Sequence, residues 1–312
     1  MRRMLLGRVA ALLPTLLLAS FGVFCLVQLA PGDPAIALAG ENATVRQIDE
    51  IRQQQGFDKP LLVQYGRWLS HAAQGDLGTS ITSRESVVSA IDRTLPTTLQ
   101  LVIGGLVVAI VLGVVAGVAS ARRANTAADA VISSVASAGA AMPSFWLGLV
   151  LVSLFALGLH WFPATGFVGI TTDPGQALKS LVLPSIALGI AGAAEIARQL
   201  RAVLIEILAS DHIRTLRAKG LAERRIVWIH ALKGAGVPLM TIIGLQVSRF
   251  LGATVVVEAV FGISGIGTLV VNAAQNRDYP VVEGVVIVMA LIVIIINFVV
   301  DVSYRLVDPR IR

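Results

Sequence analysis

The sequence contains few charged residues and a single cysteine. Asp, Glu, Lys and Arg make up only 14% of its 312 residues, whereas soluble domains carry about 25%. A surface so poor in charge would not keep a chain of this length in water, so most soluble enzymes are excluded. Cys25 lies inside an apolar run, which excludes an intramolecular disulfide framework and a cysteine-based metal site.

A phosphate-binding loop of the Gly-x4-Gly-Lys-Ser/Thr kind is also missing, so an ATP-driven mechanism would require a separate ATPase. No paired inverted repeat is visible, which disfavours a transporter acting alone. Gly262–Gly265 matches the Gly-x-Ser-Gly pattern of intramembrane serine proteases. A serine nucleophile needs a base within hydrogen-bonding reach, and no histidine lies in a span after Ser264. Both alternatives are therefore distant ones.

Apolar residues dominate what is present, at 55% of the chain with a mean hydropathy of +0.80. A helix of about 20 apolar residues is long enough to cross a bilayer. The sequence predicts an all-α membrane protein with six transmembrane helices. Five of them are continuous apolar runs, namely Val9–Ala30, Leu99–Ser120, Leu181–Ala197, Val237–Val257 and Val281–Val300.

The remaining span lies within residues 130–172, a stretch of 43 residues without a charged side chain. One straight helix of that length would measure about 64 Å, roughly twice the hydrocarbon thickness. We expect a break at Pro143, with a helix of small residues before it and a span at about Phe145–Leu159 after it. A single crossing, with both termini cytoplasmic, places 16 of the 25 basic residues inside, as the positive-inside rule requires.

These spans divide the chain into three parts. Residues 1–30 hold the N-terminal segment and the first span, and residues 98–312 form a five-helix core. Between them, residues 31–97 form a small external insert with a polar helix at Arg46–Gln55 and a turn at Gly75–Gly78. Apolar residues over 61–69 recur at helical spacing, and this face either packs on the span ends or receives an external partner.

The core contains a basic cytoplasmic loop at about 198–236. Within it, Ser210 or Asp211 can cap a short helix and Gly220 can end it in a left-handed conformation. Ile213 and Leu216 share one face of this helix. Two interpretations remain open, because the loop could lie near anionic lipid headgroups or dock on a cytoplasmic protein.

Arg249 is the most unusual single residue, because it lies near the middle of the fifth span. An arginine there costs about 2.5–3.5 kcal/mol on insertion scales, so it should face protein or water. It is either satisfied structurally, by carbonyls or by Glu195, or it is a pathway residue that meets a substrate carboxylate. Glu258 lies about 13 Å further along the helix and is not its direct partner.

Small residues recur every four positions along the second span and should let a neighbouring helix approach closely. They are Ala109, Gly113, Gly117 and Ala121.

The cytoplasmic loop carries the resemblance to a known family. It reads Asp-His-Ile-Arg-Thr-Leu-Arg-Ala-Lys-Gly-Leu over residues 211–221, followed by His-Ala-Leu-Lys at 230–233. This resembles the "EAA" loop of ABC importer permeases, in particular the dipeptide, oligopeptide and nickel branch. Similar segments cover nearly the whole chain: Leu29–Pro34, Gly75–Gly78, Leu95–Leu99, Pro143–Trp146, Glu258–Phe261, Arg277–Pro280 and Asp308–Arg310. Ser264-Gly265 departs from the family, which usually has Pro-Gly after the phenylalanine.

The resemblance implies the type I ABC importer permease fold and a multi-pass protein of the bacterial inner membrane. The chain would form the path for short peptides, with nickel or another small solute as the alternative cargo. It would be no enzyme and bind no cofactor or metal, since ATP and Mg²⁺ belong to two cytoplasmic ATPase subunits. The other implied partners are an external solute-binding protein and a second, related permease subunit, which makes a heterodimer the expectation. Nucleic acid is not expected.

The resemblance also implies which residues act. The loop helix would lie in a groove of the ATPase, with an apolar ridge formed by Ile213, Leu216 and Leu221. A pathway role or a contact between subunits is expected for Arg249, Glu258, Ser264 and Gly265. The complete set expected to couple to the ATPase is Asp211, Ile213, Arg214, Thr215, Leu216, Arg217, Ala218, Lys219, Gly220 and Leu221.

Overall fold

The computed structural model describes residues 14, 16–26, 34–39, 43–170 and 173–307. These residues are mostly helical, and the one strand-like pairing among them is an isolated antiparallel bridge between Thr79 and Ser86. The chain divides into two compact units. The first unit is Met1–Pro96 with Gly265–Ile295, and the second unit is Thr97–Ser264 with Ile296–Arg312. The predicted three-part division stays a prediction, because these units are defined by packing and not by the side of the membrane.

The first unit holds the described part of the first span, Leu16–Leu26, and short helices that follow it. The apolar face predicted over residues 61–69 lies on helix α4 (Leu61–Ala73), which packs on this span through Tyr65. The Tyr65 hydroxyl lies 2.8 Å from Ser20 Oγ, and its ring centroid lies 5.6 Å from that of Phe24. Leu61 and Leu62 stay exposed. The helices are α2 (Pro34–Ala39), α3 (Val45–Gln55), α4 (Leu61–Ala73), α13 (Ile266–Gln275) and the first parts of α5 (Val87–Arg122) and α14 (Tyr279–Val307).

The sequence signals in the insert correspond to these elements. Thr44 and Gln47 form a reciprocal capping box at the start of α3, so the predicted polar helix is confirmed. Gly75 and Gly78 both adopt positive φ, and Asp76 Oδ1 accepts a hydrogen bond from the Gly78 N–H at 2.9 Å. The predicted turn is therefore present.

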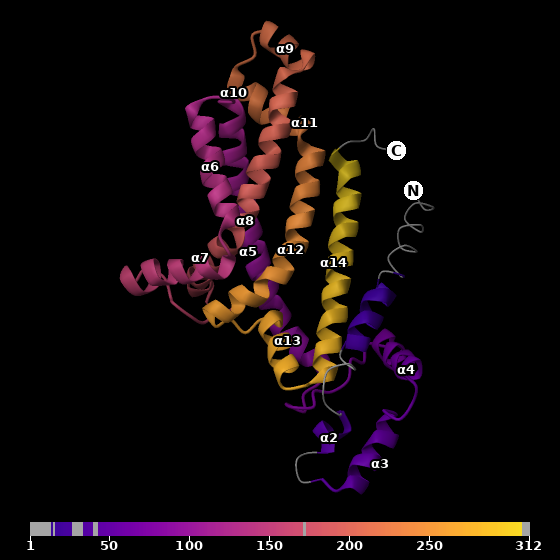
Figure 1. Ribbon diagram of the computed structural model, residues 1–312. Coiled ribbons are helices and arrows are strands. Elements are labelled where there is room, and N and C mark those ends of the chain that lie inside the picture. The colour runs from indigo at the N-terminus through magenta and orange to yellow at the C-terminus, as the bar shows by residue number, and fades with distance from the viewer. Residues whose placement is uncertain (1–13, 15, 27–33, 40–42, 171–172, 308–312) are drawn as a thin grey trace. The chain divides into compact units, whose positions relative to one another are not determined.

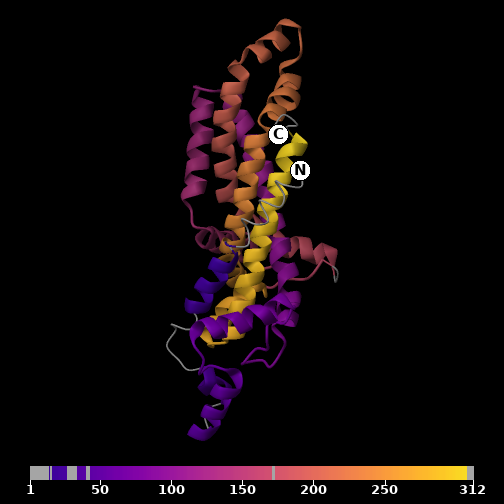
Figure 2. The ribbon, with the colours of Figure 1, turned by 90° about the vertical axis from the view of Figure 1, so that its right-hand side faces the viewer.

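The second unit is organised around α8, which packs against α6, α7 and α12 (Figure 1). In Figures 1 and 2, α6 and α8 run side by side over most of the length of α6. The elements here are α6 (Ala127–Ala141), α7 (Ser144–Leu151), the π-helix η1 (Val152–Gly158), α8 (Pro174–Ala209), α9 (Asp211–Ala218), α10 (Glu223–Arg225), the π-helix η2 (Ile226–Ala231), α11 (Leu232–Gly234) and α12 (Gly236–Phe261), besides the remainder of α5 and α14.

Glycines allow α5 and α8 to lie almost backbone to backbone. A methyl group on Gly113 would come within 2.7 Å of Ile196 Cβ, and one on Gly189 within 2.6 Å of the Gly105 carbonyl oxygen. The predicted small-residue stripe of α5 is buried at this contact, so its packing role is confirmed. Contacts advance in the same direction along both helices, from Gly104 and Ser185 to Gly117 and Leu200. The two helices are therefore parallel, as expected for spans that enter from the same side of the membrane.

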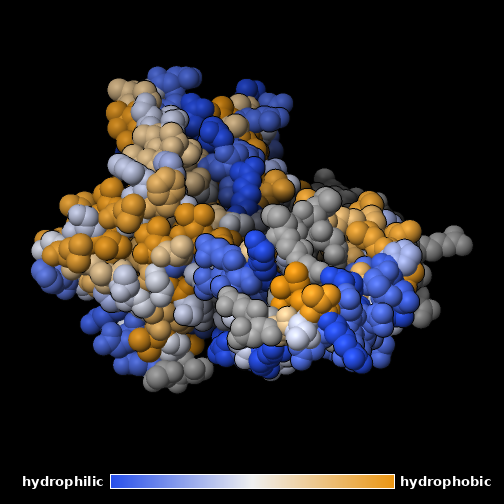
Figure 3. All heavy atoms as spheres, turned by 60° about the horizontal axis from the view of Figure 1, so that its bottom comes forward, coloured by the Kyte–Doolittle hydropathy of each residue, from blue (hydrophilic) through white to orange (hydrophobic). Residues whose placement is uncertain are grey.

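Among the described residues, four helices are long and apolar enough to cross a membrane, namely α5, α8, α12 and the Tyr279–Val300 part of α14, or five spans if α6 and α7–η1 form one broken span. The chain also exposes many large apolar side chains, and orange hydrophobic surface is extensive in Figure 3. Of the predicted first span, Val9–Ala30, only part lies within the described residues. The motifs at Leu29–Pro34 and Asp308–Arg310 lie almost wholly outside them.

The charge-free stretch breaks where predicted, since α6 ends at Ala141 and Pro143 directly precedes α7. The two halves of this stretch differ in direction. Asp129 bonds Arg201 and Gly139 lies beside Ile190, so α6 runs antiparallel along α8. Residues 145–159 instead form α7 and η1, which turn away from α6 by 100°. Small residues let α6 lie close along α8, as at Gly139 beside Ile190.

We predict that Gly113→Ala lowers the midpoint of thermal unfolding in detergent. The added methyl would lie 2.7 Å from Ile196 Cβ and 2.8 Å from the Ala193 carbonyl oxygen, which is too close for either atom. Overpacking of this kind costs about 1–3 kcal/mol. Gly252→Ala is the matched control, because no heavy atom lies within 4 Å of its added methyl. Alanine favours a helix over glycine, so the control should unfold at the same temperature or slightly higher. Equal midpoints for both variants would contradict the close-packing account.

Candidate functional site

The short helix α9 lies at the end of α8 and is defined by a sharp break on either side. Ser210 leaves helical geometry with ψ 153°, and its side chain makes no capping hydrogen bond, although its position is the predicted one. After Lys219, Gly220 adopts φ +76° and donates its N–H to the Arg217 carbonyl at 2.9 Å. The predicted left-handed end of the helix is therefore present.

The apolar face of α9 packs on its own chain. Ile213 is fully buried in a cluster with Leu204 of α8 and Ile226 of η2, and Leu216 and Leu221 pack against this cluster while half-buried. The expectation that Ile213 presents itself to a groove of another protein is therefore wrong. A helix this short lacks stability of its own, so its most apolar side chain is used to anchor it.

Arg217 ties the two ends of the loop together. Its guanidinium donates to both carboxylate oxygens of Glu223, at 3.1 and 2.8 Å, and to the Leu208 carbonyl at 3.2 Å. The hydrogen bond from Arg217 holds the pKa of Glu223 below its ordinary value, and the same bond raises the pKa of Arg217. A carboxylate with a lowered pKa loses its stabilising contribution only as the pH falls through that lowered value, so the bridge persists at neutral pH.

The outward face of α9 is polar and mainly basic. Arg214 forms an exposed pair with Asp211 at 3.1 Å, and Lys219 is exposed without a salt bridge to any described residue. His212, Thr215 and Ala218 are also exposed. This face is available to a partner, whereas Ile213 and Arg217 hold the element in place.

A buried ion pair that the sequence did not suggest joins α6 to α8, the helix that precedes α9. Asp129 of α6 is 4% exposed and accepts two hydrogen bonds from Arg201 of α8, at 2.7 and 2.6 Å. It also accepts one from Ser120 of α5 and one from the Asn125 N–H at 2.9 Å. One carboxylate therefore joins three helices, and the pattern Thr126-x-x-Asp129 at the start of a small-residue helix was the available signal.

The C-terminal end of α12 is held by a second set of contacts. Phe261 is buried, its ring lies against Gly148 of α7, and its carbonyl accepts the Gly166 N–H at 2.9 Å. The fully buried Glu258 accepts a hydrogen bond from Thr98 of α5 at 2.6 Å. Its carboxylate faces the interior of the unit, and its expected role in the path or at a subunit contact stays a prediction.

The remaining predicted residues are not brought together. Arg249 is exposed on α12, and neither Glu195 nor any other described carboxylate forms an ion pair with it. Glu195 instead pairs with Arg198, three residues further along its own helix. Ser264 is exposed at the end of the second unit, whereas Gly265 begins α13 of the first unit, where its N–H donates to Thr268 Oγ1 at 3.0 Å.

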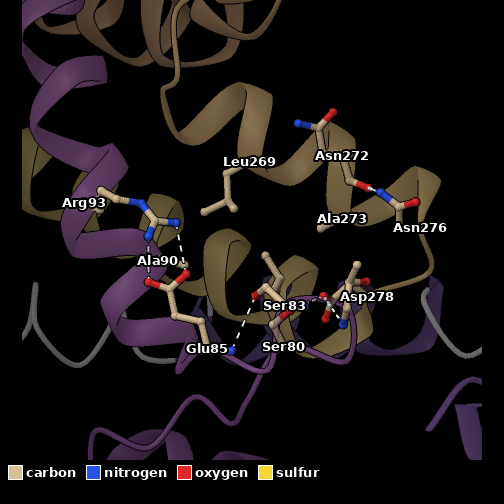
Figure 4. A pocket seen from close by; sticks show the side chains of 12 residues that line it. Ser80, Ser83, Glu85, Ala90, Arg93, Leu269, Asn272, Ala273, Asn276 and Asp278 are labelled. Atoms are coloured by element: carbon tan, nitrogen blue, oxygen red, sulfur yellow. Dashed lines mark hydrogen bonds and ion pairs between the residues drawn. The ribbon is translucent and has the colours of Figure 1, made fainter.

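A cavity of about 180 Å³ lies in the first unit, between residues 80–93 and 269–281 (Figure 4). Asp278 accepts hydrogen bonds from Ser80 Oγ, the Ile81 N–H and the Thr82 N–H, at 2.5, 3.0 and 3.1 Å. Glu85 pairs with Arg93 in a bidentate bridge at 2.8 and 3.0 Å. Because its charged groups are already paired within the chain, the cavity is assigned no ligand. Within the described residues, no group of three or more His, Cys, Asp or Glu is placed to hold a metal.

We predict that Asp129→Ala destabilises the folded protein by about 3 kcal/mol, because Arg201 would lose its partner at a mostly buried position. Chemical unfolding in detergent micelles would measure the change. Asp49→Ala is the matched control, since Asp49 pairs with Arg52 at 2.5 Å but both side chains are exposed; exposed pairs contribute at most about 1 kcal/mol. A loss at Asp129 no greater than that at Asp49 would show that the three-helix junction is not a structural anchor.

Comparison with known proteins places these features in a family. Residues 105–312 match the family described as "Binding-protein-dependent transport system inner membrane component", and residues 1–102 match its N-terminal counterpart. A putative peptide transport system permease protein of Brucella abortus is 36% identical and covers 100% of this chain and 99% of its own length. The di/tripeptide transport system permease protein of Pseudomonas aeruginosa is 38% identical, over 98% of this chain and 97% of its own.

Two further likenesses agree with this. The glutathione transport system permease protein of Salmonella paratyphi A is 39% identical and covers 98% of each chain. Among solved structures, a chain of the MetNI methionine ABC transporter in an inward facing conformation matches with a TM-score of 0.54 and 18% identity, over 70% of this chain and 96% of its own. The helical fold is thus that of an ABC importer permease, and the chain belongs to the family of inner membrane components of binding-protein-dependent transport systems.

Proposed function

We propose that this permease subunit forms the membrane path for short peptides and is driven through α9 by a separate ATPase. The observation that carries the peptide assignment is Arg249, which is exposed and lies near the middle of a helix of 26 residues. It stands about 18–20 Å from either end of α12, at a depth where lipid does not tolerate a guanidinium. The side chain must therefore meet water or another protein.

The exposed face around Arg249 runs the length of α12. Its residues recur at intervals of three or four, which is one face of a helix, and they are small or moderate in size near the arginine. They are Thr241, Leu245, Arg249, Gly252, Val256 and Ala259. We infer that this face borders the translocation path between two permease subunits.

Short peptides suit such a path chemically. Di- and tripeptides and glutathione, which name the systems of two relatives, carry free carboxylates, and a guanidinium forms charge-assisted, bidentate hydrogen bonds with a carboxylate. A nickel cation would instead be repelled by the fixed positive charge. The peptide assignment is therefore preferred over the metal.

The coupling role rests on the exposed face of α9. Arg214, Lys219 and the rims of Leu216 and Leu221 would contact the ATPase, while Ile213 fixes the helix to α8 and η2. Motion imposed on α9 would pass into α8 and through Arg201 and Asp129 to α5 and α6. Thr215, Ala218 and Asp211 lie on the contact surface, and Gly220 and Arg217 shape it.

The proposed assembly follows from these roles. Two ATPase subunits would bind ATP and Mg²⁺ and perform the hydrolysis, and this chain would bind no cofactor and catalyse no reaction. An external solute-binding protein would deliver the peptide, and a related permease chain would complete the path. The loop containing α9 and both termini would then lie in the cytoplasm, with the chain crossing the bacterial inner membrane.

We predict that Arg249→Gln raises the KM for uptake of labelled di- and tripeptides by about tenfold or more, since hydrogen bonds to charged groups contribute about 1.5–3 kcal/mol. Arg249→Lys, which keeps the charge, should lose less. Peptides with an amidated C-terminus should be taken up equally by wild type and Arg249→Gln. Uptake would be measured in cells that lack or carry the chain.

The outcomes separate the parts of this proposal. Unchanged peptide uptake in cells lacking the chain, with loss of nickel uptake, would refute the peptide function. Equal losses for free and amidated peptides would instead remove the carboxylate contact while leaving the peptide function intact.

We also predict that Arg214→Glu combined with Lys219→Glu reduces the amount of ATPase that co-purifies with this chain. Both changes reverse the charge of an exposed side chain and leave the buried side chain of Ile213 unchanged. Arg123→Glu is the matched control, because Arg123 is an exposed basic residue at the turn between α5 and α6. The docking role of α9 is refuted if the double variant retains as much ATPase as the control.

A further inference from the structure

The element formed by α7 and η1 is apolar on the side that its own chain leaves uncovered. The α7 helix packs against α8 and α12, with Gly148 beside Phe261 of α12, and Leu151 and Ala156 are also buried. The uncovered side carries six large hydrophobic residues that are 45–62% exposed. These are Phe145, Trp146, Leu149, Leu154, Leu157 and, just beyond η1, Leu159. Orange surface is prominent at the left of Figure 3, where α7 and η1 project in Figure 1.

The direction of this element is unlike that of a membrane span. It meets α6 at 100°, and α6 runs along α8, which is one of the membrane-crossing helices. A helix perpendicular to a span lies close to the plane of the bilayer. Its 15 residues, Ser144–Gly158, would reach only about 22 Å even if upright, less than the roughly 30 Å of hydrocarbon.

The length of α6 sets the depth of the element. The turn before α6 carries the exposed residues Arg122 and Arg123, which belong at a membrane surface. From there the 15 residues of α6 rise about 22 Å, so α7 begins about 8 Å below the opposite boundary of the hydrocarbon. Interfacial helices bury their apolar faces about 5–10 Å into this boundary.

We propose that α7 and η1 form a lipid-embedded helix that lies parallel to the membrane plane in the leaflet opposite the α5–α6 turn, which is the outer leaflet in the proposed orientation. The element does not cross the membrane, and acyl chains cover its exposed face.

Two observations favour lipid over a protein partner. The preceding helix α6 also exposes apolar side chains, with Val131 and Val135 62% and 68% exposed, and α6 runs along α8, one of the membrane-crossing helices. Residues 130–172 also contain no Asp, Glu, Lys or Arg, whereas the rim of a protein interface is polar. Hydrocarbon is the one surrounding that demands a complete absence of charge.

The C-terminal end of the element keeps its backbone groups hydrogen-bonded within the chain. At its end the Leu159 N–H donates to the Leu154 carbonyl at 3.0 Å, and the Trp161 N–H donates to the Phe155 carbonyl at 2.9 Å. Backbone groups in hydrocarbon must be bonded internally. Trp161, which is 62% exposed, then occupies the position where aromatic residues gather at membrane interfaces.

Spin-label depth measurements would test the proposal in the assembled transporter, reconstituted in vesicles of phosphatidylethanolamine and phosphatidylglycerol. Single cysteines would replace Phe145, Leu149 and Leu157 in a Cys25→Ser background, and power saturation with oxygen and a soluble nickel chelate would give each depth. The expected result is high oxygen accessibility and three depths that agree within about 5 Å, the radius of a helix. Labels at Val131, Val135 and Ala138 of α6 are the matched controls, and their depths should change by about 1.5 Å per residue.

Two results would overturn the proposal. A progressive change of about 18 Å from position 145 to position 157 would mean that the element crosses the membrane as a span. Immobile labels with low access to both reagents would mean that another protein subunit covers it. Neither result depends on which cargo is carried or on which side faces the cytoplasm, so failure here is distinct from failure of the proposed function.

Discussion

The close approach of α5 to α8 is the constraint on which the second unit depends. Backbone atoms of the two helices come so near at Gly105, Gly113 and Gly189 that no side chain fits between them. In a bilayer, apolar side chains gain nothing by leaving water, so helices associate through such close van der Waals contact. With α5 fixed on one side of α8, the remaining surface of α8 is free to receive α6, α7 and α12.

Two buried carboxylates in this unit join helices that are distant in sequence. Asp129 joins three helices at one end, and Glu258 joins α12 to α5 at the other. An unpaired charge in a medium of low dielectric is costly, which makes such contacts specific in register. Arg249 differs from these groups because it is exposed on α12, and its costly position is the basis of the pathway role proposed above.

Much of this organisation could be predicted from the sequence, because single residues suffice to signal it. Pro143 marked the break in the charge-free stretch, Gly220 marked the end of α9, and the four-residue spacing of small residues marked the face of α5 that packs. Each of these signals is local. Three general facts suffice to interpret them: proline interrupts a helix, glycine can adopt positive φ, and side chains on one helix face recur every three or four residues.

What could not be predicted depends on contacts between distant residues. Hydropathy cannot tell which half of residues 130–172 lies along α8, since both halves are apolar; the answer follows from the fit of small residues near Gly139 against Ile190. Asp129 and Arg201 are 72 positions apart, and no pattern in one sequence pairs them. Ile213 was predicted to be available to a partner. It is buried because η2, a segment that follows α9 in the chain, folds back against it.

The bridge between Arg217 and Glu223 has a consequence for how α9 would be recognised. With its apolar side chain buried and its ends tied by that bridge and by Gly220, the helix is already formed before any partner arrives. Ordering a flexible segment on binding consumes a large share of the interaction free energy. A preformed helix avoids this loss, so a small contact surface suffices for the proposed contact with the ATPase.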